Sequence, residues 1–381
     1  MKLLFLCTSL EPGRDGVGDY ARLLAEACIQ LGHTCRLVAL NDPFLDSPRE
    51  EVQPGREQEI SCLRLPAKDS WSDRIAAAQV YAYKFAPDWL SWQLVPYGFH
   101  PKGIIPKEAR ELKKLCAGRH NQVLLHELWI GLSAGESFKN RFWGWLQRRA
   151  FSPFLESLQP EVLQTTNATY KIVLERNGWT AAVLPLFGNI PVAQPMPPMP
   201  DPHRWSGCIF GTVHPQFDPR CFDTLIAGAQ VSQRKLRILG FGRLGEYGEK
   251  MFAELETRYS GKLETAVLGE KTPVEISLLF QALDFGLATH PWALAGKSGA
   301  VAAMLDHGLP VIVPRDDWAL RRNPVHVSAI DPLMIKLSEM PPELMAGRLA
   351  RRHPPTPRLP AVAAAFLSSL GAIQTSPAFT Q

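Results

Sequence analysis

The hydrophobic pattern alternates between short, continuously apolar runs and longer segments with a helical period. Residues 3–6 form the first apolar run, residues 11–19 a glycine-bearing loop and residues 20–28 the first helical segment, before a second apolar run at 35–40. Runs that are apolar on both faces are typical of parallel strands covered by helices. The start of the chain therefore predicts a βαβ arrangement.

This alternation continues through the chain. Further strands are expected at 60–65, 89–95, 122–126, 207–211, 236–239, 263–268, 285–288 and 310–313, and helices at 72–85, after Pro106, after Asp218 and at 247–259. Repeated βα units imply parallel sheets. The predicted fold class is therefore α/β, with two Rossmann-like parallel-sheet domains.

A proline-rich segment separates the two halves. Residues 191–202 hold six prolines, a density that neither a helix nor a central strand accommodates. The sequence thus predicts a first domain at 1–190, a linker at 191–202, a second domain at 203–355, and a C-terminal helix at 360–375 that packs back onto the first domain. Ligands of open α/β sheets bind beyond the carboxyl ends of the strands, so we expect the two domains to face a ligand-binding cleft.

Composition excludes several classes of protein. The 381 residues are 46% hydrophobic and 20% charged, as in a globular chain. The 41 basic residues against 37 acidic ones leave a net charge of only +4, too small to favour a nucleic-acid partner. Seven scattered cysteines without a C-x-x-C pair indicate reduced thiols and a cytoplasmic location. No stretch approaches the ~20 apolar residues of a membrane span, and the opening run ends too early for a signal peptide.

The loop before the first helix is a candidate phosphate site. Gly16 and Gly18 stand between the first strand and the first helix, and Asp19 follows them. Small residues let a ligand approach the backbone, and a helix N-terminus favours an anion. A tight βα turn in which Asp19 caps the helix explains the same residues equally well.

Two polar residues follow the strand expected at 122–126. The side chains of His126 and Glu127 would emerge at its carboxyl end. A histidine there can donate to a sugar hydroxyl or act as an acid or base, and a neighbouring carboxylate can accept from hydroxyls. The alternative is a histidine that only satisfies backbone groups at the end of a strand.

The segment from His290 to Gly299 leads into a helix of small residues and is the candidate diphosphate site. Lys297 and Ser298 stand at the start of that helix. Free amides, the helix dipole, a hydroxyl and an ammonium group would there meet a diphosphate without any metal. The alternative is a capped helix with a solvated lysine.

Residues 240–245 match the G-x-G-x-x-G dinucleotide fingerprint, with Glu264 downstream. An NAD enzyme usually carries this fingerprint on the first strand of its nucleotide domain, whereas an earlier strand is expected here at 207–211. The segment is read either as a nicotinamide-dinucleotide site or as an ordinary βα turn.

Residues 138–151 form a basic, aromatic helical stretch. Such a helix can lie on an anionic membrane surface. A helix that buries its aromatic side chains while its arginines reach out to water has the same composition. No metal-ligand cluster, Walker P-loop or G-x-S-x-G elbow is found in the sequence.

Together, several segments resemble the family-4 glycosyltransferases of the GT-B fold, and the resemblance covers residues 2–314. It is carried by residues 16–20, 32–33, 126–127, 166–170 with 174–178, and 303–311. Members of that family move a sugar from a nucleotide donor to an acceptor with retained anomeric configuration and without a catalytic metal. The resemblance implies an acceptor-side first domain, a nucleotide-sugar-binding second domain, and no cofactor besides the nucleotide-diphosphate sugar as co-substrate.

By that resemblance, Gly16 and Gly18 approach the donor diphosphate and His126 contacts the transferred sugar. Gly269 and Glu270 would lie near the nucleobase. These assignments rest on the family pattern alone.

The sequence departs from that pattern at charged positions. The family's two glutamates, separated by seven residues, fall at Ala295 and Ala303, and the expected arginine and lysine are not evident in residues 212–217. Lys297 stands where the family has an aromatic residue. We therefore expect Lys297, with Arg243 as helper, to neutralise the departing diphosphate.

The sequence thus predicts a glycosyltransferase in glycan biosynthesis, with His126, Glu127 and Lys297 as catalytic residues. The expected donor contacts are Gly16, Gly18, Asp19, Arg243, Gly269, Glu270, His290, Ser298 and Gly299. The acceptor would be a glycan, a lipid-linked sugar or a small molecule, with peripheral membrane contact through 138–151. Two alternatives remain: a degenerate binding or scaffold protein, and an NAD-dependent oxidoreductase.

Overall fold

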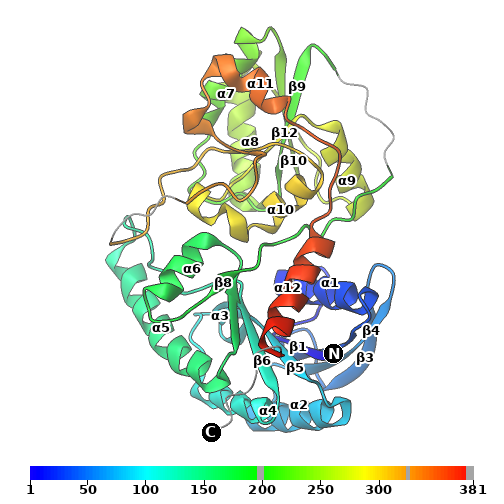
Figure 1. Cartoon of the computed structure of the whole chain (residues 1–381). Helices are drawn as coiled ribbons and strands as arrows, with labels where there is room; N and C mark the ends of the chain where they lie inside the picture. The colour runs from blue at the N-terminus through cyan, green and yellow to red at the C-terminus, as the bar shows by residue number, and fades with distance from the viewer. Residues whose placement is uncertain (195–200, 323–326, 375–381) are drawn as a thin grey trace. The chain divides into compact units, whose positions relative to one another are not determined.

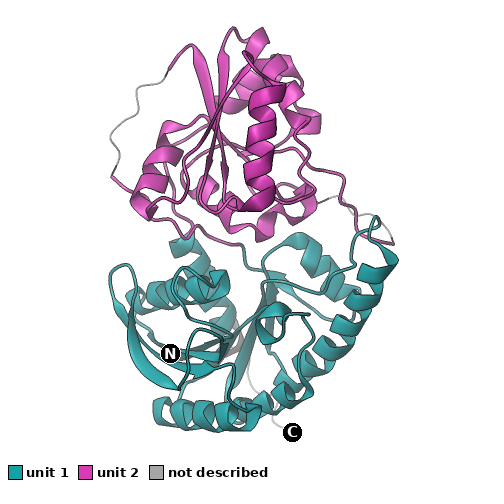
Figure 2. Ribbon diagram, turned by 180° about the vertical axis from the view of Figure 1, so that it is seen from behind, with its two compact units in different colours: residues 1–185, 359–381 teal, residues 186–358 magenta. Residues whose placement is uncertain are grey.

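The computed structural model describes residues 1–194, 201–322 and 327–374 (Figure 1). These residues form two compact α/β units (Figure 2). Unit 1 holds Met1–Pro185 together with the chain from Leu359 onward, and unit 2 holds Leu186–Arg358. The C-terminal helix therefore belongs to the first unit. Part of the expected linker, residues 195–200, and the last position of the helix expected at 360–375 lie outside the described residues.

Unit 1 is built on an eight-stranded sheet in the order β3-β4-β2-β1-β5-β6-β7-β8. Its strands are β1 (Lys2–Cys7), β2 (Thr34–Asp42), β3 (Arg49–Pro54), β4 (Glu59–Pro66), β5 (Trp89–Leu94), β6 (His120–Leu125), β7 (Val162–Thr165) and β8 (Ala182–Val183). The edge strand β3 pairs antiparallel with β4, and the other pairs are parallel. Without β3 the order is Rossmann-like and reverses direction between β1 and β5.

Helices lie on the sheet of unit 1 (Figure 1). They are α1 (Gly16–Gln30), α2 (Trp71–Phe85), α3 (Pro96–Phe99), the 3-10 helix η1 (Lys107–Leu112), α4 (Lys113–Cys116), α5 (Phe138–Leu158), α6 (Ala168–Glu175) and α12 (Leu359–Gln374). In α12, the buried Phe366 packs its ring 5.8 Å from that of Phe5 in β1. The C-terminal helix thus contributes to the core of unit 1.

Unit 2 has a six-stranded parallel sheet in the order β11-β10-β9-β12-β13-β14. Its strands are β9 (Arg204–Phe210), β10 (Lys235–Phe241), β11 (Leu263–Val267), β12 (Phe285–Leu287), β13 (Val311–Val313) and β14 (Met334–Lys336). Numbered within the unit, this is the 3-2-1-4-5-6 order of a Rossmann sheet, which reverses direction between β9 and β12.

The helices of unit 2 follow the same βα rhythm. They are α7 (Cys221–Val231), α8 (Gly245–Arg258), α9 (Pro273–Ala282), η2 (Trp292–Lys297), α10 (Gly299–Asp306), η3 (Leu337–Glu339), η4 (Pro342–Leu344) and α11 (Met345–Leu349). Two cores result, one on each face of the sheet. The prediction of two Rossmann-like parallel-sheet domains is confirmed.

Both chain segments that enter and leave unit 2 are tied to Asp306, at the end of α10. Its buried carboxylate accepts from the backbone N–H of Gly188 at 2.8 Å and from Nε of Arg358 at 2.5 Å. Farther along, the N–H of Ala193 donates to Ser277 Oγ at 2.8 Å. Residues 186–194 thus pack as part of unit 2. The boundary between the two units therefore comes before residue 191, where the prolines predict the linker to begin.

Local differences from the predicted pattern have clear physical causes. The edge strand β3 is mostly polar, and β14 is only three residues long, so neither gave an apolar run. Helix α1 begins at Gly16 rather than at residue 20, because Asp15 caps it: its Oδ1 accepts from the N–H groups of Val17 at 2.9 Å and Gly18 at 2.8 Å.

In the described part of the chain, no helix combines the length and apolarity needed to cross a bilayer. All seven cysteines are free thiols, five of them buried.

Candidate functional site

The sheet of unit 2 changes winding direction between β9 and β12, and polar residues gather just beyond the carboxyl ends of these strands. Ligands of open α/β sheets bind at such a switch point. Here the hydroxyl of Thr289, after β12, donates to the carbonyl of Thr212, after β9, at 3.1 Å. This bond joins the two loops that frame the candidate site.

Arg315 and His214 form the centre of the site. Arg315 follows β13, is only 5% exposed, and donates through Nη1 to Nδ1 of His214 at 3.3 Å and through Nη2 to Oε1 of Gln216 at 2.9 Å. His214 Nδ1 also accepts from the N–H of Gln216 at 3.1 Å. Because Nδ1 accepts these bonds, the ring proton of His214 is on Nε2.

Two positive charges meet two neutral histidines at this site. Burial, followed by the charges of Lys297 and Arg315 among other groups, lowers the pKa of His290 to about 4. Burial and the charges of Arg315 and Lys297 also lower the pKa of His214, against a smaller opposing effect of Asp317. At neutral pH the positive charge of the cluster therefore resides on Lys297 and Arg315. Arg315 shares its charge with the exposed carboxylate of Asp317, whose Oδ1 lies 3.3 Å from its Nε.

The N-terminus of α10 adds polar groups beside Lys297. Ser298 caps the helix, and its Oγ accepts from the N–H of Val301 at 3.3 Å. Within the described residues, the N–H groups of Gly299 and Ala300 have no hydrogen-bond partner. Gly299 is exposed and has open space around its Cα. The structure thus brings together His290, Lys297, Ser298 and Gly299, at a helix end suited to an anion.

Arg243 is engaged elsewhere. Its Nε lies 3.1 Å from Oε2 of Glu270, and both side chains are exposed. The N–H of Gly242 donates to the carbonyl of Gly269 at 2.9 Å, so the turns after β10 and β11 are joined. The helper role of Arg243 and the nucleobase contacts of Gly269 and Glu270 stay predictions.

The fingerprint-like segment 240–245 has a structural explanation. A Cβ on Gly240 would meet the ring of Phe252 at 2.7 Å, and Gly242 and Gly245 have positive φ angles of 80° and 74°. Packing therefore requires glycine at position 240, and the turn favours glycine at positions 242 and 245. The segment follows β10, the second strand of its sheet, rather than the first.

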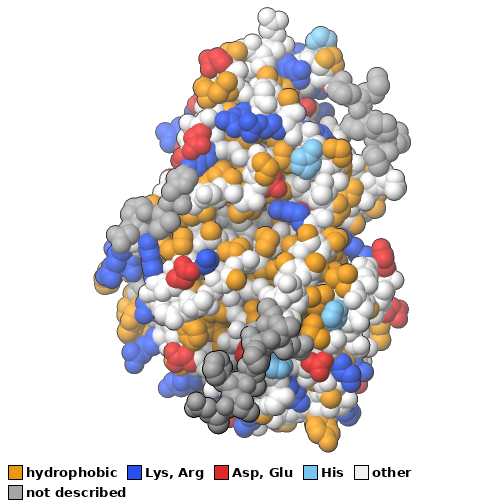
Figure 3. All heavy atoms as spheres, viewed as in Figure 1, with side chains coloured by type: hydrophobic (Ala, Val, Ile, Leu, Met, Phe, Trp, Pro, Cys, Tyr) orange, Lys and Arg blue, Asp and Glu red, His pale blue; other side chains and the backbone are white. Residues whose placement is uncertain are grey.

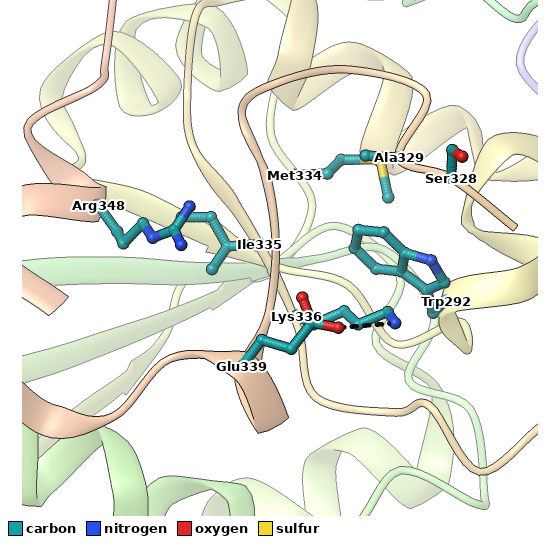
Figure 4. Close-up of a pocket in the computed structure, with 8 residues that line it drawn as sticks. All are labelled: Trp292, Ser328, Ala329, Met334, Ile335, Lys336, Glu339 and Arg348. Carbon is teal, nitrogen blue, oxygen red and sulfur yellow. Dashed lines mark hydrogen bonds and ion pairs between the residues drawn. The ribbon is translucent and has the colours of Figure 1, made fainter. Parts of the chain in front are cut away.

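A pocket of about 280 Å³ adjoins the cluster (Figure 4). Its wall includes Trp292, whose N–H donates to the carbonyl of Arg315 at 2.7 Å and whose Nε1 donates to Val327 at 2.7 Å. Lys336 lies 5.1 Å from the indole ring and pairs with Glu339 at 2.9 Å. The volume lies just below the usual range of ligand pockets, about 300–1,000 Å³, and we assign it no ligand.

In unit 1, the glycine loop is organised by Asp15. Asp19, which the sequence offered as a helix cap, instead accepts from the N–H of Gly13 at 3.1 Å and from Nη1 of Arg22 at 2.9 Å, so that alternative was wrong. A Cβ on Gly18 would lie 2.3 Å from the carbonyl oxygen of Ser9, whereas Gly16 has open space. Gly18 therefore permits close packing of α1 on the chain after β1.

His126 lies directly after β6 and is 8% exposed. Its Nε2 is 2.9 Å from Oε1 of Gln93, and its ring meets that of Tyr20 edge-on at 4.9 Å. Burial lowers the pKa of His126 to about 3. It is therefore a neutral hydrogen-bonding group at neutral pH and not an imidazolium that could act as an acid. Its side chain bonds another side chain, not the backbone groups at the strand end. Glu127, next to it, is half-buried.

The analysis of the sequence missed Arg315 and the role of His214. Arg315 could have been found from its place in the sequence, because it follows the carboxyl end of the strand predicted at 310–313. Ala295 and Ala303, at the positions of the expected glutamates, are fully buried. The described residues contain no group of three or more His, Cys, Asp or Glu side chains that could hold a metal ion.

No protein-family model matches the sequence, and no curated protein matches it either. Solved structures do resemble it. An α,α-trehalose-phosphate synthase (UDP-forming) from Burkholderia vietnamiensis aligns with a TM-score of 0.54 at 10% identity, over 100% of this chain and 98% of that one. An α,α-trehalose 6-phosphate synthase from Burkholderia multivorans gives a TM-score of 0.50 at 11% identity, over 98% and 99% of the two chains. At such identity the likeness establishes the fold, and the chain has the GT-B fold that the sequence predicts.

Proposed function

We propose that this protein is a glycosyltransferase that takes a sugar from a nucleotide-diphosphate donor. The observation that carries the proposal is the cluster at the switch point of unit 2. Lys297, directly before α10, and Arg315, bonded to His214, supply two positive charges, and burial keeps His214 and His290 neutral. A diphosphate is the ligand group whose charge matches this arrangement.

The chemical role follows from where negative charge develops. In the transfer step, an acceptor hydroxyl oxygen bonds to the anomeric carbon, while the bond from that carbon to the diphosphate oxygen breaks. The nucleoside diphosphate leaves with the bonding electron pair, and the hydroxyl proton passes to the departing oxygen. In this proposal the acceptor approaches from the face that the diphosphate leaves, so the anomeric configuration is retained. Lys297, Arg315 and the free amides of α10 stabilise the growing charge in place of a metal.

Arg315 supplies a positive charge that the loop after β9 lacks. The loop 212–217 lacks the basic residues that the resemblance to family 4 implies, yet Arg315 binds His214 and Gln216 of that same loop. The guanidinium of Arg315, two residues after β13, thus contacts the loop after β9. In unit 1, His126 and Glu127 would orient hydroxyl groups of the transferred sugar or of an acceptor such as a glycan, a lipid-linked sugar or a small molecule.

We also propose that α5 docks on an anionic membrane surface from the cytoplasmic side. Phe138, Phe142 and Trp145 are 84%, 50% and 52% exposed, and their spacing puts them on one side of the helix. The rings of Phe142 and Trp145 stack at 6.1 Å, and the guanidinium of Arg149 lies 5.6 Å from the centre of the Trp145 ring.

The charge of this helix matches an anionic surface. Basic and hydrophobic side chains mix along the edge of unit 1 where α5 runs (Figure 3). The sequence from residue 138 to residue 155 contains Lys139, Arg141, Arg148 and Arg149 and no acidic residue. The buried aromatic residues of α5, Phe151 and Phe154, lie farther along and face the core. An exposed aromatic face with flanking cations suits the lipid headgroup region.

The experiment that tests the enzymatic proposal measures release of nucleoside diphosphate from a panel of UDP-, GDP-, ADP- and TDP-sugars. We expect one donor class to turn over, slowly with water and faster with an acceptor, and Lys297→Ala to abolish turnover while the fold is retained. A degenerate binding protein, suggested by Ala295 and Ala303, would bind a donor without releasing product. Binding of NADH in place of every sugar nucleotide would contradict the proposal.

A further inference from the structure

A continuous row of buried polar side chains crosses the sheet of unit 1. It starts at His126 and runs through Gln93 and Ser91 of β5, Gln122 of β6 and Gln164 of β7 to Ser369 of α12. Ser91, Gln93 and Gln122 are 0% exposed and Gln164 is 3% exposed. Buried polar groups are costly unless every one is satisfied.

Strand register places these side chains on one face of the sheet. Ser91 pairs with Gln122 across β5 and β6, and Gln93 follows Ser91 by two residues. Gln164 stands two residues beyond the partner of Gln122 in β7. The row is therefore continuous across three neighbouring strands.

The far end of the row fixes the direction of every hydrogen bond. Ser369 donates to the backbone carbonyl of Phe366 at 2.6 Å, and a carbonyl can only accept. Ser369 Oγ must then accept from Gln164 Nε2, at 3.3 Å. The oxygen of the Gln164 amide consequently faces Gln122, which donates to it through Nε2 at 3.0 Å.

The same logic continues to the histidine. Oε1 of Gln122 accepts from the hydroxyl of Ser91 at 2.6 Å, and Ser91 Oγ accepts from Gln93 Nε2 at 2.7 Å. Only Oε1 of Gln93 is left to face His126, at 2.9 Å from Nε2. Nε2 must therefore carry the ring proton. Nδ1 is left as an acceptor, and within the described residues it has no hydrogen-bond partner.

We propose that Gln93, Ser91, Gln122, Gln164 and Ser369 are positioning residues that hold His126 in the Nε2–H tautomer, so that Nδ1 accepts a hydrogen bond from a ligand hydroxyl. Only the identity of that ligand, a sugar, rests on the proposed function. Ser369 of helix α12 thereby determines which ring nitrogen of His126 donates and which one accepts. The ligand must bring the donor.

The test is the tautomer of His126 in the full-length protein, read from the ¹⁵N resonances of the two ring nitrogens at pH 7.5. The signals are assigned by their loss in His126→Gln. We expect a protonated Nε2 and an unprotonated Nδ1 in the wild type. In Ser369→Ala the terminal donor is lost, so the row can reverse, and the tautomer ratio should shift about tenfold toward Nδ1–H, the effect of about one net hydrogen bond.

A matched control is available in α5. Ser157 donates to the carbonyl of Phe154, three residues earlier, at 2.7 Å, as Ser369 does to Phe366, but it takes no part in the row. Ser157→Ala should leave the tautomer unchanged, and Gln93→Leu should shift it even further than Ser369→Ala. A wild-type proton on Nδ1, or a ratio that is the same in Ser369→Ala and Ser157→Ala, would overturn the proposal. The readout needs no substrate, so it is independent of whether the protein transfers a sugar.

Discussion

The Nη1 group of Arg315 lies 3.3 Å from Nδ1 of His214, and this contact links the carboxyl ends of β13 and β9. The two strands are not neighbours, because β12 stands between them. A buried guanidinium thus spans the switch point of the unit 2 sheet. It also pairs with Asp317 at 3.3 Å, and the proposed function gives its charge, with that of Lys297, a role in binding a diphosphate.

Replacing Arg315 tests its role in anion binding. Arg315→Met should weaken nucleotide-diphosphate binding about 10- to 100-fold, the loss expected for one hydrogen bond to a charged group. It should also raise the pKa of His214, because a positive neighbour and a donor to Nδ1 both disappear. Calorimetry and histidine NMR measure the two effects. Arg258→Met, at the end of α8, is the control and should change neither.

The two glycines at the start of α1 should respond differently to the same substitution. Gly18→Ala should lower the free energy of unfolding by about 3 kcal/mol, because its Cβ would meet a backbone oxygen that cannot move away. Gly16→Ala meets open space and should stay within about 1 kcal/mol of the wild type. Urea unfolding of both variants measures this. Equal losses would show that the loop does not pack as described.

His126 should make the fold sensitive to acid. Its pKa in the folded protein is lowered from 6.5 to about 3, so the unfolded chain binds more protons below pH 6.5 and stability falls as the pH drops toward 3. Between pH 8 and pH 5 this effect should cost about 2 kcal/mol of the free energy of unfolding. In His126→Gln the pH dependence over that range should be shallower by the same amount. An unchanged pH dependence would mean that His126 is not buried in its neutral form.

The aromatic residues of α5 should drive membrane binding. Full-length protein should sediment with vesicles that contain phosphatidylserine and not with pure phosphatidylcholine vesicles, because cations and exposed rings act together. Combined Phe138→Ser, Phe142→Ser and Trp145→Ser substitutions should abolish sedimentation. Tyr83→Ser, which changes an 81% exposed aromatic residue of α2, should not. Sedimentation that survives the triple substitution would contradict docking through α5.

The alternation of apolar runs was sufficient to predict the two Rossmann-like sheets. It could not predict β3, because this edge strand is mostly polar and exposed and so has no continuous apolar run. It also placed the start of α1 four residues late, because a loop rich in glycine hides the capping role of Asp15. Caps and edges depend on local geometry rather than on hydrophobic period.

Strand ends were a better guide to the candidate site than motifs were. His126, His290 and Lys297 were found because they follow strands or begin a helix, and Arg315 was within reach of the same rule. The row from His126 to Ser369 was not, because two side chains bonded to each other in it, Gln164 and Ser369, are 205 positions apart in sequence. The members become neighbours only through strand register and the return of α12. Such pairings require the three-dimensional structure.

The central claim is that Lys297 and Arg315 bind a nucleotide diphosphate without a metal. Thermal unfolding in the presence of UDP-, GDP-, ADP- and TDP-sugars, with EDTA throughout, tests it most directly. A donor at 100 times its Kd adds about 2.7 kcal/mol of stability, so we expect one class to raise the Tm of the wild type and of Arg258→Met. The same donor should raise the Tm of Lys297→Met and Arg315→Met much less, because a 10- to 100-fold weaker Kd leaves only about 0.4–1.4 kcal/mol. The claim would be contradicted if a donor stabilised Lys297→Met and Arg315→Met as much as the wild type. It would also be contradicted if no donor stabilised the wild type.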